Sequence, residues 1–352
     1  MLVFGICSGD LRWRLMADDR ELATGEARVN ALPHSTGTFT QPLDAIKAME
    51  PGVTYYTHLA FLRPDGSEIV RHAVELPVNG PSVEAAPAIQ SQLRVRRGKT
   101  ITVSAGAASY EFDPASARLV SASMGGDALL TGSRFTIWRP LNPNDLILPL
   151  RIRPADIPDL NKYTTTVRSW KIGESTASVR IEAEADHQVN ERNSFSTSFT
   201  YEIGRDGALR VEYSVRPRVE VQWLPEIGME LETAPGLDNL RWLGLGPLDA
   251  YPNEKTAPIL GVYAGRVGSD TAKGVKAIRW AELTSDHRVG VRVEGSPYVR
   301  AGGRALRVLP SVGGRSEKNR RPENPEYRLD AAPPASFVGS FSIHLVARER
   351  KR

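Results

Sequence analysis

Phe199-Thr-Tyr-Glu-Ile203, the turn Arg205-Asp-Gly207 and Leu209-Arg-Val-Glu-Tyr-Ser-Val215 together decide the fold of this chain. On both sides of the turn, apolar or aromatic residues alternate with polar ones, so each segment has one apolar face when it is extended. Asp-Gly is a strong turn pair between two such runs, because glycine adopts a positive φ without strain. The stretch therefore predicts a β-hairpin with one buried face.

The same period of two, or a run rich in β-forming residues, occurs along most of the chain. Further examples are Leu11–Leu15, Tyr55–Phe61, Ile69–Val74, Leu93–Arg96, Ile101–Val103 and Ser178–Ala183. Turn pairs such as Pro51-Gly52 and Gly125-Gly126 separate these runs. Leu43–Glu50, which Pro51 would end, is the one helix predicted in the first third of the sequence. We predict an all-β protein.

Residues 76–92 have the composition of a linker between two domains. Prolines and small residues gather there, at Pro77, Gly80, Pro81 and Pro87. The region before it, residues 1–80, is long enough for a small β-sandwich. The region after it, residues 92–352, is dense in strand patterns without a second break, which predicts one large β-sandwich.

Composition and charge exclude several classes of protein. The chain has 352 residues, of which 41% are hydrophobic and 24% charged, as in ordinary globular proteins. The net charge of +4 is spread among nearly as many carboxylates as cations, so we expect neither nucleic acid nor a membrane as a partner. Cys7 is the only cysteine, which rules out a disulfide within the chain. With no leader pattern and no apolar run near ~18 residues, we expect a cytoplasmic protein.

Three motifs of the larger region follow one another in a distinctive order. They are Phe135-Thr-Ile-Trp-Arg-Pro-Leu-Asn-Pro-Asn-Asp145, Leu224-Pro-Glu-Ile-Gly-Met229 and Trp242-Leu-Gly-Leu-Gly-Pro-Leu-Asp-Ala-Tyr-Pro-Asn-Glu-Lys255. In order and spacing they resemble the small-chain domain of the β-galactosidases of glycoside hydrolase family 2. The family motifs read roughly Trp-Arg-Ala-Pro-x-Asp-Asn-Asp, Leu-Pro-Arg-Ile-Gly and Gly-Arg-Gly-Pro-x-Glu-Asn-Tyr-Pro-Asp-Arg. Leu11-Arg-Trp13 with Ala23-Thr-Gly25 is similar to the sandwich domain that precedes it.

The resemblance implies a fold and a set of partners. The fold is an immunoglobulin-like β-sandwich, incomplete at its start, over residues 1–80, followed by a galactose-mutarotase-like β-supersandwich over residues 92–352. In relatives the supersandwich packs beside a catalytic barrel, which supplies the acid/base and nucleophile glutamates. No segment of this chain matches the barrel, so those glutamates have no counterpart here. The implied partners are a galactoside or related carbohydrate, a chain that carries the barrel, and further copies of this chain, with no cofactor.

The motifs also depart from the family pattern. The departures are Pro143 for Asp, Glu226 for Arg, Asp249 for Glu, Asn253 for Asp and Glu254 for Arg. Several charge changes within related motifs indicate a rearranged polar cluster. Val312–Lys318, which matches a late family loop, lacks the tryptophan that stacks on the sugar in relatives.

Candidate site residues follow from these motifs. Asp249, Glu254 and Glu226 are the catalytic candidates, with Glu230 and Glu232 nearby, because two carboxyls with separated pKa values can act as acid and base. Solvated surface carboxylates are the alternative. The substrate-binding candidates are Trp138, Arg139, Asn144, Asp145, Trp242, Tyr251, Arg279 and Trp280. The alternatives for these are core tryptophans flanked by arginines and aromatics packed beneath a tight turn. The six histidines have no metal-ligand spacing.

Three functions remain open at this point. The first is a small subunit or C-terminal part, without catalysis of its own, that completes a glycosidase supplied by another chain. The second is a self-sufficient glycoside hydrolase of the β-galactosidase type that uses carboxylates of the supersandwich. The third is a sugar-binding module.

Overall fold

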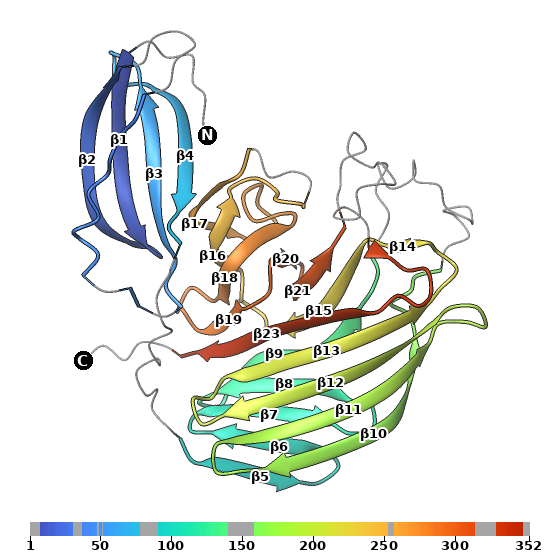
Figure 1. Cartoon of the computed structure of the whole chain (residues 1–352). Coiled ribbons are helices and arrows are strands. Elements are labelled where there is room, and N and C mark those ends of the chain that lie inside the picture. The colour runs from blue at the N-terminus through green and yellow to red at the C-terminus, as the bar shows by residue number, and fades with distance from the viewer. Residues whose placement is uncertain are drawn as a thin grey trace. The chain divides into compact units, whose positions relative to one another are not determined.

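The computed structural model describes residues 8–30, 37–47, 49–50, 52–77, 91–139, 158–252, 257–313 and 329–347. These residues form 23 strands and no helix (Figure 1), so the all-β prediction is confirmed. The predicted helix over Leu43–Glu50 is wrong, because residues 43–47 form a turn and irregular backbone. An isolated segment of that length is too short to offset the cost of helix nucleation. The described residues contain no helix long and apolar enough to cross a membrane.

The chain divides into two compact units. One comprises Met1–Pro87 with Ile259–Val262, and the other comprises Ala88–Pro258 with Tyr263–Arg352. The strand β17 (Ile259–Arg266) has residues in both.

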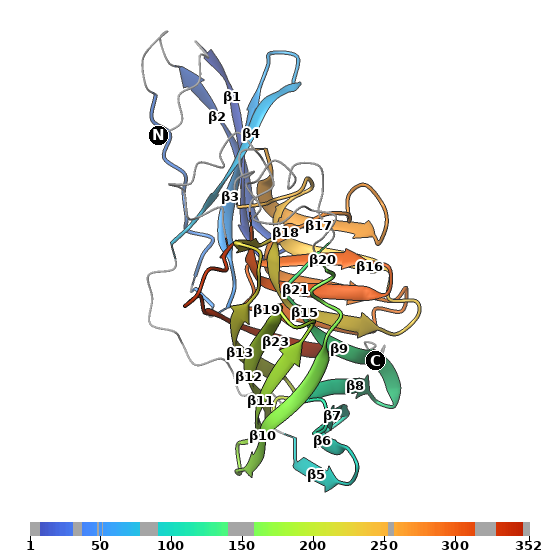
Figure 2. The same ribbon diagram turned by 90° about the vertical axis from the view of Figure 1, so that its right-hand side faces the viewer.

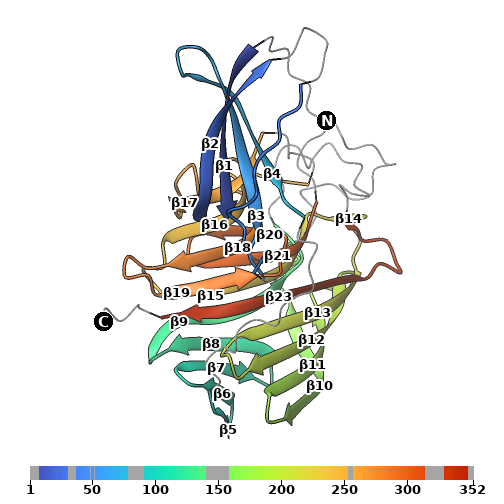
Figure 3. The ribbon, with the colours of Figure 1, turned by 60° about the vertical axis from the view of Figure 1, so that its left-hand side comes forward.

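The smaller unit contains one antiparallel sheet in the order β2-β1-β3-β4 (Figure 3). Its strands are β1 (Ser8–Ala17), β2 (Arg20–Asn30), β3 (Tyr55–Leu62) and β4 (Glu68–Glu75). On β1, Leu11, Trp13 and Leu15 are buried and alternate with exposed arginines. Trp13 lies against Gly25, its register partner, where an added Cβ would be 2.5 Å from the indole ring. The alternation therefore gives this sheet one apolar face.

The larger unit is built from two large antiparallel sheets. The first, which we call the β15 sheet, has the order β5-β6-β7-β8-β9-β15-β21-β20. Its strands are β5 (Leu93–Arg97), β6 (Ile101–Ala105), β7 (Ala108–Asp113), β8 (Arg118–Met124), β9 (Asp127–Thr136), β15 (Glu226–Thr233), β20 (Tyr298–Gly302) and β21 (Ala305–Val312).

The second sheet, the β13 sheet, has the order β10-β11-β12-β13-β23-β19-β18-β16. Its strands are β10 (Thr164–Glu174), β11 (Ser178–Gln188), β12 (Ser194–Gly204), β13 (Leu209–Arg218), β16 (Asn239–Gly246), β18 (Lys276–Thr284), β19 (Gly290–Glu294) and β23 (Phe337–Val346). A short pair, β14 (Trp223–Leu224) and β22 (Leu329–Asp330), completes the described strands.

The two sheets lie face to face as the layers of a sandwich, with β10–β13 in one and β5–β9 in the other (Figure 2). Aromatic side chains from both layers meet between them. The ring of Phe135 on β9 lies 5.7 Å from that of Phe199 on β12 and 5.0 Å from that of Tyr213 on β13, edge to face in both cases. These residues are buried, as alternation on the inner faces of a sandwich requires.

The hairpin predicted from Phe199–Val215 is confirmed. β12 and β13 are consecutive antiparallel strands, with Ile203 opposite Leu209 next to the turn. Gly207 has φ +78° in that turn, a backbone conformation that suits glycine. The Tyr110 hydroxyl of the other sheet donates to the Gly207 carbonyl at 2.7 Å, which fixes the turn against the second layer.

One strand takes part in both sheets. The first residues of β18, Lys276 and Ala277, pair with β20 of the β15 sheet. Trp280–Thr284, further along the same strand, pair with β19 of the β13 sheet. The sandwich is therefore closed along β18 by backbone hydrogen bonds as well as by side-chain packing.

β15 lies in the middle of its sheet, between β9 and β21. Its register with β21 shifts between Ile227 and Met229, and Gly228 stands at this irregularity. A Cβ on Gly228 would lie 2.0 Å from the backbone carbonyl oxygen of Val308, a contact that only movement of the backbone could relieve. Glycine at this position lets the two strands approach.

We expect Gly228→Ala to lower the free energy of unfolding of the larger unit by about 2 to 3 kcal/mol, because the added methyl overpacks two backbones. Urea unfolding followed by tryptophan fluorescence measures this, since five of the six tryptophans lie in that unit. Gly173→Ala on β10, where an added Cβ meets nothing within 4 Å, is the matched control. Equal midpoints for the two variants would contradict the close approach.

A buried histidine lies between β10 and β12. His187 is 4% exposed, and its ring stacks on that of Phe195 with centroids 4.5 Å apart. Its two ring nitrogens lie within hydrogen-bond distance of the Thr165 and Thr197 hydroxyls. Burial lowers the pKa of His187 to about 4, and the nearby Asp186 carboxylate opposes this only in part.

The His187 pKa predicts how stability depends on pH. An unfolded histidine binds its proton near pH 6.5, whereas the folded one does so near pH 4, so folding is disfavoured once pH falls below 6.5. The loss is complete near pH 4 and amounts to up to about 3 kcal/mol. Unfolding free energies measured at several pH values should fall less steeply over this window in His187→Gln than in the parent. The exposed His287→Gln serves as control, and parallel curves for His187→Gln and the parent would refute the assignment.

Candidate functional site

Four charged side chains form a row across adjacent strands of the β15 sheet. Glu230 on β15 is the register partner of Arg134 on β9 and of Arg307 on β21. Arg307 is in turn the partner of Arg300 on β20. The Glu230 carboxylate accepts from Arg134 Nε at 2.7 Å and from Arg307 Nε at 2.6 Å. Cross-strand pairing thus brings together residues from distant parts of the sequence.

Glu226, at the start of β15, bridges the two arginines that stand opposite each other. Its Oε1 accepts from Arg300 Nη2 at 2.6 Å and from Arg307 Nη1 at 2.8 Å. Like charges directly opposite on paired strands repel, so this carboxylate stabilises the β20–β21 pair. Glu226 is 1% exposed. Burial lowers the pKa of Arg307, but the Glu226 and Glu230 carboxylates raise it by more, so the net shift is upward.

A pocket opens beside this row, with a volume of about 300 Å³. Its charged lining residues are Arg139, Glu230, Arg300 and Arg307, and its remaining lining residues are Ala301, Gly302 and Ala305. The small residues leave room over the strands, so the pocket presents guanidinium and carboxylate groups to a ligand. Among the described residues, no group of three or more His, Cys, Asp or Glu could hold a metal ion.

The geometry of Glu226 and Glu230 favours recognition over acid/base chemistry. Each carboxylate is held by two arginines through charge-assisted hydrogen bonds, which fix both side chains in place. A retaining glycosidase needs two carboxyl groups about 5–5.5 Å apart that can both reach the substrate. Glu226 and Glu230 are 1% and 7% exposed and are already paired with arginines, so they offer little free surface for that role.

Asp249, the second catalytic candidate, lies elsewhere, in the turn after β16. Its carboxylate is 3.6 Å from Nζ of Lys276, a lysine with no exposed side-chain surface. Lys276 also donates to the Pro247 carbonyl at 2.9 Å and lies 5.3 Å from the centroid of the Trp242 ring. Burial lowers the pKa of Lys276, while Asp249 opposes that shift. Asp249 thus pairs with Lys276, whereas Glu226 pairs with Arg300 and Arg307, so the two carboxylates belong to different clusters.

Three aromatic candidates for substrate binding are buried. Trp242 has no exposed surface, and its Nε1 donates to the Leu245 carbonyl at 3.2 Å. Trp138 is 5% exposed, with its ring 6.5 Å from that of Trp223. Tyr251 is 6% exposed and packs with Val275, Tyr298, Leu309 and Val312. Arg139, the neighbour of Trp138, lines the arginine-rich pocket. It is the residue by which the motif that begins at Phe135 contributes to this pocket.

Trp280 lies on the outer side of the β13 sheet beneath two cations. The guanidinium carbons of Arg292 and Arg241 lie 4.3 and 5.0 Å from its ring centroid. Glu282 accepts from both arginines, at 2.9 and 3.4 Å, and holds them there. Trp280 is 4% exposed, whereas its neighbour Arg279 is exposed. The indole ring therefore has little surface left for a sugar.

The structure brings only part of the predicted site together. Glu226, Glu230 and Arg139 belong to one cluster, while Asp249, Trp242, Arg279 and Trp280 lie away from its pocket. Asn144, Asp145 and Glu254 lie outside the described residues. The substrate and catalytic roles of all these residues stay predictions.

Arg134, Arg300 and Arg307 were not among the sequence-derived candidates. The pattern that could have revealed two of them is the turn at Gly303-Arg304, which joins β20 to β21 and sets Arg300 opposite Arg307. Their shared carboxylate at Glu226 comes from a strand more than 70 residues earlier, and sequence spacing alone does not bring it to them.

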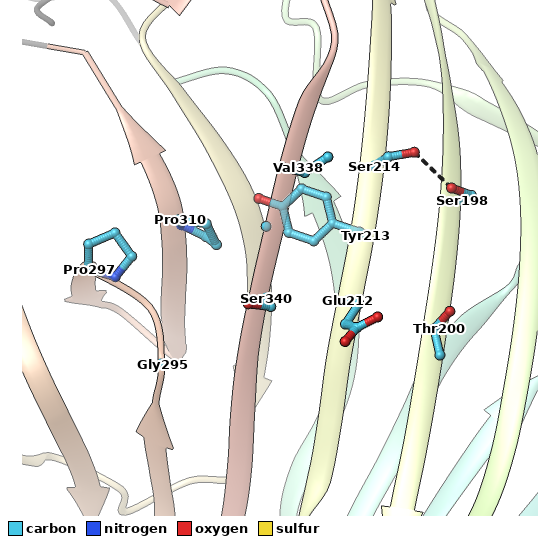
Figure 4. Close-up of a pocket in the computed structure, with 11 residues that line it drawn as sticks. Ser198, Thr200, Glu212, Tyr213, Ser214, Gly295, Pro297, Pro310, Val338 and Ser340 are labelled. Carbon is cyan, nitrogen blue, oxygen red and sulfur yellow. Dashed lines mark hydrogen bonds between the residues drawn. The ribbon is translucent and has the colours of Figure 1, made fainter. Parts of the chain in front are cut away.

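A larger pocket, of about 590 Å³, lies on the β13 sheet (Figure 4). Hydroxyls and one carboxylate line one side of it, at Ser198, Thr200, Glu212, Ser214 and Ser340, with Pro297 and Pro310 opposite. The Ser198 and Ser214 hydroxyls bond each other at 2.8 Å, as the dashed line in Figure 4 shows. No cation is among the described lining residues. The arginine-lined pocket has the stronger recognition chemistry, and we take it as the candidate site.

Comparison with known proteins finds relatives that are all β-galactosidases or parts of them. The family model of the beta galactosidase small chain matches residues 104–301. A β-galactosidase of Priestia megaterium is 27% identical over 266 residues, which is 70% of this chain and 24% of that protein. A β-galactosidase of Aeromonas hydrophila is 25% identical over 273 residues, 71% of this chain and 26% of that protein. The chain thus spans about a quarter of the length of these relatives.

Solved structures also match parts of the chain. A galactose mutarotase related enzyme from Lactobacillus acidophilus matches with 11% identity and a TM-score of 0.41, over 73% of this chain and 98% of that one. A galactose 1-epimerase from the same species matches with 12% identity and a TM-score of 0.40, over 73% and 99%.

Removal of the Glu226 charge tests the bridge between the two arginines. We expect Glu226→Gln to lower the free energy of unfolding by about 3 kcal/mol, because it removes a buried charge that joins two partly buried guanidinium groups. Glu182→Gln removes the carboxylate of an exposed pair with Arg180 and should cost less than about 1 kcal/mol. Urea unfolding at neutral pH compares the two, and a similar small effect for both would show that Glu226 is not a structural bridge.

Proposed function

Because this chain belongs to the β-galactosidase small-chain family, we propose that it is the non-catalytic part of a β-galactosidase-type glycosidase. In this proposal it completes a catalytic domain that another chain supplies. The observation that carries it is that the candidate catalytic carboxylates among the described residues are paired with cations within the family fold. Glu226 and Glu230 are neutralised by arginines, and Asp249 lies against a buried lysine.

The share of each relative that this chain matches supports the same proposal. The chain corresponds to about a quarter of each full-length β-galactosidase that it matches. Hydrolysis of a galactoside is a property of those whole proteins, so we assign to this chain a share in forming the enzyme, with a galactoside or related carbohydrate as the substrate of the assembly.

We also propose where the protein works and in what form. A single cysteine suits the reducing cytoplasm. We propose a homo-oligomer that also binds the catalytic chain, and the exposed apolar side chains of Leu248 and Val338 are available for such contacts. Within the chain we propose an immunoglobulin-like domain over residues 1–80 and the supersandwich over residues 92–352.

The test of this function is an activity assay on the chain with and without its partner. The recombinant chain, made in a host that lacks β-galactosidase, should leave a nitrophenyl β-galactoside unhydrolysed at every pH tried. Tagged chain purified gently from its own cells should carry hydrolytic activity. A high-salt wash should separate the activity from the tag by removing the catalytic chain, and recombination of the two fractions should restore it.

Two results would contradict the proposal. One is hydrolysis by the lone chain in proportion to its concentration and abolished by Glu226→Gln or Asp249→Asn, which would make it an enzyme in its own right. The other is recombined fractions that stay inactive or an eluted fraction that is fully active alone, which would leave this chain no part in the enzyme.

A further inference from the structure

The arginine-lined pocket has more positive than negative charge in the part of the chain that the structure describes. Arg139, Arg300 and Arg307 supply three guanidinium groups to its lining, and Glu230 supplies one carboxylate. Arg300, Arg307 and Glu230 are held in place by cross-strand pairing, so a ligand meets them already oriented. The surplus charge favours an anionic group in the pocket.

The N–H groups of Arg300 and Arg307 that do not bond Glu226 or Glu230 indicate which kind of anion the pocket would bind. A guanidinium group has five N–H donors in a planar fork. Arg300 uses one of them, towards Glu226, and Arg307 uses two, towards Glu226 and Glu230. Both side chains line the pocket and are about one-fifth exposed, so the remaining donors face a water-accessible space. Planar donors of this kind complement a carboxylate through two parallel hydrogen bonds.

The same pocket also offers acceptors. The Glu230 carboxylate lines it, and an ionised carboxylate accepts hydrogen bonds only. A ligand that carried only a carboxylate would leave this acceptor unused. Hydroxyl groups on the ligand would donate to it.

We infer that this pocket binds a hexuronate, a sugar that carries both a carboxylate and hydroxyls. The carboxylate lies against Arg300 and Arg307, and ring hydroxyls donate towards Glu230. The volume of about 300 Å³ holds one such ring. This binding belongs to the chain itself and is independent of the proposed role in a larger glycosidase.

Titration calorimetry on the isolated chain tests the inference with three probes: D-galacturonate, D-galactose and acetate. D-galacturonate should bind at least tenfold more tightly than either of the others, because galactose lacks the carboxylate and acetate lacks the hydroxyls. Binding should weaken as salt is added, since the contact is between charges near the surface. Equal affinities for galacturonate and galactose, equal affinities for galacturonate and acetate, or no heat with galacturonate would each overturn the proposal.

Variants locate the site. Arg300→Gln should weaken galacturonate binding at least tenfold, and Arg300→Lys, which keeps the charge but not the planar fork, should weaken it to a smaller extent. Arg180→Gln, at an exposed position on β11, should leave it unchanged. Urea unfolding of each variant shows whether it is folded. If Arg300→Gln does not fold, Arg300→Lys serves as the test variant. Undiminished binding by a folded Arg300 variant would place the ligand elsewhere.

Discussion

The change of partner along β18 is the constraint on which the larger unit depends. The strand pairs first with β20 in the β15 sheet and then with β19 in the β13 sheet, so the two layers share a backbone at this point. The crossing is closely packed, because a Cβ on Gly244 of β16 would lie 2.0 Å from the Ala277 carbonyl oxygen. Lys276, at the start of β18, is fully buried and holds the turn at Pro247 and Asp249. The position of β20, and with it Arg300, follows from this junction.

The candidate site shows how a sheet can organise charge with little help from loops. Arg134, Glu230, Arg307 and Arg300 are neighbours because their strands are paired in register. A buried carboxylate that loses one cation becomes costly, so the members of the row depend on one another. Such a cluster is suited to holding a charged ligand in a fixed orientation.

Much of the fold could be predicted from local patterns, because a period of two and an Asp-Gly turn act over a few residues. β12 and β13 follow this logic, and so does the all-β class. The predicted helix at Leu43–Glu50 failed because a short helical pattern has no stability without packing. The site was harder to predict. The family motif places Glu226 in a conspicuous position, but only the order of β9, β15, β21 and β20 shows that three arginines surround the two carboxylates, and strand order is a long-range property.

Glu226 also bears on how this sequence could have diverged. The related β-galactosidases have arginine in the motif position that Glu226 occupies, as the resemblance of Leu224-Pro-Glu-Ile-Gly228 to their motif implies. An arginine there would stand against Arg300 and Arg307, the two groups that Glu226 now joins. Glu230 would then be the one carboxylate of the cluster left to face several guanidinium groups. Substitutions at positions 226, 300 and 307 are therefore coupled, because each one changes the charge that the other two side chains meet.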